Sequence, residues 1–123
     1  MDFTEGSTFI LEQHLWAIIS DPKQSNNEIV IVNFTTYKNK GYEDTSCIVE
    51  VGEHPFITNK SYIFYRRSRI VDLSKLELFY RTSELKPQDR LSPELLEKIR
   101  VGAKESPFLP FGVERILSMQ ELI

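Results

Sequence analysis

The sequence predicts an α+β fold, mainly β, in which a bent sheet or small barrel precedes two helices. Five or so short apolar runs follow one another at near-regular spacing over about the first seventy residues, separated by polar or turn-forming residues. Over about the last thirty residues, apolar side chains recur at helical spacing instead. A chain of 123 residues can build one core but not two ordinary domains. We therefore expect residues 1–123 to form one domain.

The first three strands are expected at residues 8–11, 15–20 and 28–34. The second of these ends at Asp21 and Pro22, a pair that favours a turn. Residues 28–34 read EIVIVNF, which is too apolar to alternate cleanly. This run predicts a central strand with both faces covered.

A long polar loop over residues 36–45 follows the central strand and carries Tyr37 and Tyr42. Loops of this length in compact domains are usually functional or mobile. The next strand, residues 46–51, contains Cys47, which we expect to be buried. Residues 62–65 and 68–71 predict one or two further strands with an arginine-rich junction.

The helical signals lie near the C-terminus. Ser92 is a good N-cap, Pro93 suits the first helical position, and Glu94 falls in the first turn. An apolar stripe then predicts a helix over residues 93–103, formed by Leu95, Leu96, Ile99 and Ala103. After two prolines, a second set of apolar positions predicts a short terminal helix: Val113, Ile116, Leu117 and Leu122.

Composition excludes several classes of protein and site. The formal net charge of -3 argues against binding nucleic acid by overall charge, and no apolar run approaches the roughly 20 residues of a membrane span. An acidic N-terminus and a single cysteine predict a cytoplasmic protein. There is no glycine-rich phosphate loop, no Cys/His metal spacing and no Gly-x-Ser-x-Gly elbow. We therefore expect no cofactor and no metal.

The chain has two histidines, His14 and His54, each beside an apolar run. Thr35 ends the central strand between them, so all three side chains are expected near strand ends, where a β-scaffold can bring them together. A basic group, Lys60 with Arg66, Arg67 and Arg69, follows without an intervening acid. A pair of imidazoles beside cations and a hydroxyl suits metal-free cleavage of RNA.

The order of these features resembles the PemK/MazF family of toxin endoribonucleases over roughly the first 75 residues. The resemblance rests on the order of five features. These are a glycine (Gly6), an apolar strand that ends in serine (15–20), a strand that ends in two threonines (32–36), a strand that begins with serine (61–63) and a strand that carries arginines (67–71). It implies a small SH3-like barrel, a catalytic threonine at Thr35, a homodimer, and an antitoxin whose disordered tail crosses the RNA groove. His14 and Leu15 stand where the family carries an Arg-Pro pair, and residues 52–57 fall outside the family pattern.

If the chain cleaves single-stranded RNA, His14 and His54 would act as base and acid in either order. Thr35 would donate a hydrogen bond to the phosphate, and one of three arginines would offset its charge: Arg66, Arg67 or Arg69. Asp44 or Glu53 would orient a histidine. Tyr37 and Tyr42 would stack unpaired bases, whereas Trp16, in an apolar strand, is expected in the core.

A second hypothesis belongs to another class: a small barrel that binds a protein or nucleic acid and catalyses nothing. His14 and His54 would then be structural, and His54 would shape the turn before Pro55. A regulator encoded beside a toxin or restriction system is a third hypothesis. Ribonuclease activity that survives EDTA and depends on both histidines would distinguish the enzyme from the other two.

Overall fold

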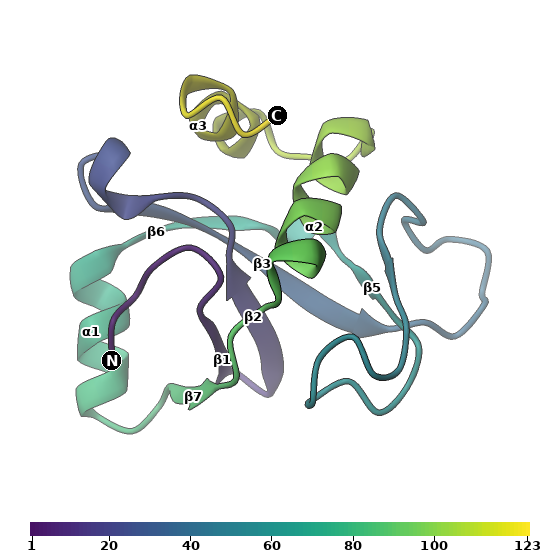
Figure 1. Ribbon diagram of the computed structural model, residues 1–123, viewed down its shortest axis with the longest axis horizontal. Helices are drawn as coiled ribbons and strands as arrows, with labels where there is room; N and C mark the ends of the chain where they lie inside the picture. The colour runs from purple at the N-terminus through teal and green to yellow at the C-terminus, as the bar shows by residue number, and fades with distance from the viewer.

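The computed structural model describes residues 1–123 and has the α+β composition that the sequence predicts (Figure 1). Seven strands form one antiparallel sheet: β1 (Thr8–Leu11), β2 (His14–Ile18), β3 (Glu28–Thr36), β4 (Ile48–Val49), β5 (Ser61–Ile63), β6 (Arg69–Asp72) and β7 (Lys86–Gln88). The helices are η1 (Pro22–Gln24), η2 (Tyr65–Arg67), α1 (Leu73–Arg81), α2 (Pro93–Glu105) and α3 (Phe111–Met119). None of the three α-helices combines the length and apolar composition that a membrane-spanning helix requires.

The central strand of the sheet is β3, which is paired along both edges. β2 lies along one edge, and the other edge is shared by β6 on the first half of β3 and β5 on the second. The pairing runs from β4 through β5, β3, β2 and β1 to β7. No pairing joins β4 to β7, so the sheet is open, and the predicted closure into a barrel is not seen in the pairing.

Side chains of β3 alternate between two cores. Val32 and Phe34 belong to a core of 18 buried residues that also includes side chains of α2 and α3. Ile29 and Ile31 belong to a second core of nine, which includes Leu76 of α1. Figure 1 shows α2 and α3 above the sheet and α1 at its left-hand end. The prediction of a central strand covered on both faces is therefore confirmed.

Both predicted helices are present, although α3 ends at Met119 and does not include Leu122, and the predicted start signals of α2 act as expected. At the start of α2, the Ser92 hydroxyl accepts a hydrogen bond from the Leu95 N–H at 3.0 Å, and Pro93 begins the helix. The apolar stripe of α2, which includes Leu95 and Ile99, is buried against the sheet. Cys47 is also buried, as predicted.

The structure adds an α-helix and a strand that the sequence did not predict. α1 begins directly after β6, where the Asp72 carboxylate accepts a hydrogen bond from the Ser74 N–H at 2.9 Å. β7 contains Pro87, which is tolerated because β7 lies at the end of the pairing path and has a partner only on its β1 side. The strand expected over residues 46–51 is shorter, since only Ile48–Val49 pair with β5.

Candidate functional site

The candidate site is a pocket of about 360 Å³ at the place where β2 begins and β3 ends. The β2–β3 pairing reaches the Leu15–Phe34 pair, but β3 continues to Thr36. The last residues of β3 therefore form no further ladder pairs with β2. We call this hollow the edge pocket; its lining residues are Gln13, His14, Leu15, Phe34, Thr35, Thr36, Lys38, Phe56, Ile57, Thr58, Asn59 and Ser61.

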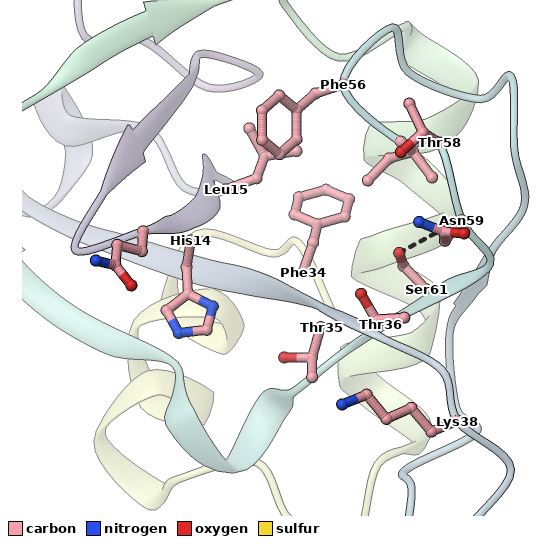
Figure 2. Close-up of a pocket in the computed structure, with 12 residues that line it drawn as sticks. His14, Leu15, Phe34, Thr35, Thr36, Lys38, Phe56, Thr58, Asn59 and Ser61 are labelled. Carbon is pink, nitrogen blue, oxygen red and sulfur yellow. Dashed lines mark hydrogen bonds between the residues drawn. The ribbon is translucent and has the colours of Figure 1, made fainter.

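The edge pocket has an apolar part and a polar part (Figure 2). Leu15, Phe34 and Phe56 form the apolar part. Along one side, the Thr35 hydroxyl and the Lys38 ammonium both point toward the side on which the His14 ring lies. No carboxylate lines the pocket, and Lys38 supplies an ammonium group. This combination favours a ligand that has both an anionic group and a flat apolar group.

The sheet register explains why His14 and Thr35 meet. Leu15 pairs with Phe34, so His14 lies across from Thr35. Successive side chains of a strand alternate, so His14 and Thr35 lie on the opposite face of the sheet from Leu15 and Phe34. His14 is half-buried, and both residues line the edge pocket. The expectation that strand ends bring these two side chains together agrees with this placement.

His54 lies elsewhere, and the expectation that both imidazoles face one cleft is not met. Its side chain is only 2% exposed and does not line the edge pocket. The Phe56 N–H donates to Nδ1 at 3.1 Å, so the ring proton lies on Nε2, which donates to the Asp89 carbonyl and lies 3.3 Å from the Thr8 hydroxyl. His54 therefore joins the loop after β4 to the segment after β7.

The expected orienting carboxylates do not contact either histidine. Asp44 accepts hydrogen bonds from the Ser106 hydroxyl at 2.6 Å and from the Ser46 N–H at 2.9 Å. Glu53 forms an ion pair with Lys98 of α2 at 2.9 Å. Both carboxylates tie loops to the helical layer, and neither acts on the edge pocket.

The three candidate arginines point to different places. The Arg66 guanidinium lies 4.4 Å from the ring centre of Phe108, in the segment between α2 and α3. Arg67 lies 5.2 Å from the ring centre of Phe64. Arg69 lies 4.7 Å from the Trp16 ring and pairs with Glu12 at 3.3 Å. Arg69 thus covers a ring of β2 and Arg67 a ring directly after β5, whereas Arg66 covers a ring outside the sheet.

Aromatic side chains extend from the edge pocket across one face of the sheet. The rings of Tyr37 and Tyr62 meet edge to face at 6.4 Å, and Tyr62 and Phe64 are 5.8 Å apart. The Lys60 ammonium lies 4.7 Å from the Tyr37 ring centre. We call this surface the aromatic–cation face; it comprises Trp16, Asn33, Tyr37, Lys60, Tyr62, Phe64, Arg67 and Arg69. Trp16 is buried, as predicted, so only its covering Arg69 is exposed.

Tyr42 lies apart from this face and is 72% exposed. Its loop is organised by Glu43, whose carboxylate accepts hydrogen bonds from the N–H groups of Lys38, Lys40 and Gly41. Desolvation alone would raise the pKa of Glu43, but these backbone donors lower it. The Glu43 contact also holds the backbone of Lys38, whose side chain enters the edge pocket.

Two residues of this site, Lys38 and Asn33, were not predicted from the sequence. Lys38 stands at the start of the long loop, directly after the candidate residue Tyr37, whereas Lys60 was already included in the predicted basic group. Asn33 is the one polar residue inside an apolar run of six positions, 29–34, and that position was a signal of a special role. Its importance becomes visible only from the sheet register.

The arrangement supports anion binding rather than metal binding. No group of three His, Cys, Asp or Glu side chains is arranged to hold a metal ion. Comparisons of the chain with models of protein families, with characterised proteins and with solved structures found no significant match.

Proposed function

We propose that this protein binds single-stranded RNA through the edge pocket and the adjoining aromatic–cation face. The observation that carries the proposal is the carboxylate-free edge pocket, which is lined by the polar side chains of His14, Thr35 and Lys38 on one side and by an apolar surface on the other. A nucleotide has the matching parts, because its phosphate suits the cation and hydroxyl and its base suits the apolar surface.

The neighbouring face extends this match beyond one nucleotide. Lys60 and Arg67 supply positive charge, and the partly exposed rings of Tyr37 and Phe64 supply surfaces for stacking. Base–aromatic stacking contributes about 1–3 kcal/mol per base and tolerates any sequence. Local placement of cations thus compensates for the net charge of -3.

Metal-independent cleavage of RNA by attack of the ribose hydroxyl is a second candidate function, favoured by the position of His14 beside Thr35. The His14 imidazole would remove the proton from the hydroxyl, and Lys38 would stabilise the charge on the phosphate. The acid that protonates the leaving oxygen would have to be water or Lys38, because His54 is committed to its buried contacts. We place binding first because it needs no second imidazole.

The family resemblance adds proposals about shape and partners. These proposals are an SH3-like architecture in an open form, a homodimer, and an antitoxin with a disordered tail. A tail of this kind would compete with RNA for the edge pocket. A complex that forms without displacing RNA would refute this arrangement.

Fluorescence anisotropy of labelled single-stranded RNA, measured in EDTA at several salt concentrations, tests the binding proposal. Lys38→Gln is the test variant, and Lys104→Gln, on α2 outside the edge pocket, is a control with the same change of charge. We expect only Lys38→Gln to weaken binding and to reduce the salt slope by about 0.7, the value for one phosphate contact on a single strand. Equal affinities for the two variants, or no saturable binding by the unmodified protein, would refute the proposal.

The same samples distinguish the second candidate function. Intact RNA after long incubation indicates binding alone. Products that end in a cyclic phosphate, and that disappear in His14→Ala, would establish cleavage. Cleavage that persists in His14→Ala would exclude His14 as its base.

A further inference from the structure

The buried side chain of Asn33 has no hydrogen-bond partner. Asn33 is 1% exposed, and neither its Oδ1 nor its Nδ2 has a partner within the protein. A buried amide without partners is unfavourable, and such groups are rare in folded proteins outside functional sites. Asn33 is the one residue of this chain with buried, unpartnered side-chain atoms.

The sheet register places Asn33 within the aromatic–cation face. Trp16 of β2 pairs directly with Asn33, and the Phe64 N–H donates to the Asn33 carbonyl from the other side. The Asn33 side chain therefore projects between the rings of Trp16 and Phe64. Arg69 lies over the first ring and Arg67 over the second, and both arginines are exposed. The arginine–ring contacts and the Arg69–Glu12 ion pair are exposed and therefore weak, so a ligand can displace these side chains.

The position of Asn33 also fits the edge pocket. Thr35 lies two residues further along β3 on the same face, and this spacing corresponds to about 6.6–6.8 Å. A single nucleotide spans this interval between its phosphate and its base. A phosphate joins two nucleosides, so a phosphate held by Thr35 and Lys38 would place one base beside Asn33 and the other against the apolar part of the edge pocket.

We infer that the Asn33 amide forms hydrogen bonds with an adenine base that enters between Trp16 and Phe64 when the arginine side chains move aside. This inference rests on the proposed RNA-binding function. An asparagine amide offers one acceptor and two donors, and it forms a bidentate pair with the amino group and ring nitrogen of adenine. The bound base provides the partners that the buried amide lacks. The displaced guanidinium groups remain near the RNA and can contact its phosphates.

The test compares the affinities of four short RNA homopolymers and one abasic oligomer for the unmodified protein and for Asn33→Leu. The unmodified protein should prefer the adenine oligomer to the uracil oligomer by at least about fivefold, as expected for one bidentate pair. Asn33→Leu should lose this preference while binding the abasic oligomer as before. Asn33→Ser, which removes the amide without adding volume, is the second variant if the leucine does not fit.

Two results would overturn the inference: RNA binding by the unmodified protein without a preference for adenine, or the same preference in a folded Asn33 variant. If the unmodified protein binds none of the oligomers, the proposed function itself fails and the inference fails with it. Thermal unfolding of both variants provides an independent readout. Asn33→Leu should unfold at the same or a higher temperature, because it removes an unpartnered buried amide.

Discussion

Replacing each histidine by alanine should separate a structural imidazole from a binding one. His54→Ala removes a hydrogen-bond acceptor from the Phe56 N–H and a donor to the Asp89 carbonyl, and it leaves a void where the buried ring was. His14→Ala removes a half-buried ring for which no hydrogen bond to the protein is seen.

The magnitude follows from these contacts. Two neutral hydrogen bonds contribute about 0.5–1.5 kcal/mol each, and the void adds a further cost, so His54→Ala should lower the free energy of unfolding by about 2–4 kcal/mol. The Thr8 hydroxyl also donates to the Asp89 carbonyl and limits the loss there. His14→Ala should change stability by no more than about 0.5 kcal/mol.

Urea denaturation followed by tryptophan fluorescence measures both values, because Trp16 is the only tryptophan and is buried in the smaller core. RNA affinity, measured well below the unfolding midpoint, completes the comparison. His14→Ala should weaken RNA binding with stability intact, whereas folded His54→Ala should bind nearly as well as the unmodified protein. A stable His54→Ala protein would refute the structural role of this imidazole.

Three further changes test the packing and electrostatics. Gly102→Ala should destabilise the fold by about 1–3 kcal/mol, because the added methyl group would lie 2.7 Å from the Cys47 Cβ in a packed core. An unchanged midpoint of thermal unfolding would contradict this prediction. Cys47 should resist alkylation until the protein unfolds, because burial raises the pKa of its thiol to about 11; rapid labelling of folded protein would show that the site opens. Desolvation would raise the pKa of Glu53, but the Glu50 N–H and Lys98 lower it overall. The ionised Glu53 carboxylate should therefore stabilise the fold fully above pH 4.5, and this stabilisation should be lost as the pH falls below that value. Glu53→Gln should accordingly show a smaller loss of stability in acid than the unmodified protein.

The sequence predicted those elements that depend on local signals. α2 has an N-cap, a proline and an acidic residue in the right order, and the structure uses Ser92 and Pro93 as expected. α1 was missed because it follows β6 without a break and buries only Leu76, so it has no strong apolar stripe. β7 was missed because Pro87 argues against a strand except at an edge, and edge position is a tertiary property.

The candidate site was predictable only where it depends on one strand pairing. His14 and Thr35 end neighbouring strands, so their proximity follows from the strand order alone. The burial of His54 depends on Asp89, which is 35 residues away and belongs to a segment for which no strand was expected. Asn33 lies in a strand that was predicted well, but its unpartnered amide is a property of the packed sheet.

The central claim is that the edge pocket and the aromatic–cation face form the RNA-binding surface. An amide-resolved NMR titration with single-stranded RNA tests this most directly. The account predicts that the largest shift changes fall on residues 14–16, 33–38, 56–64 and 67–69, with α3 unchanged. Changes concentrated on α3, or no changes at saturating RNA, would contradict it.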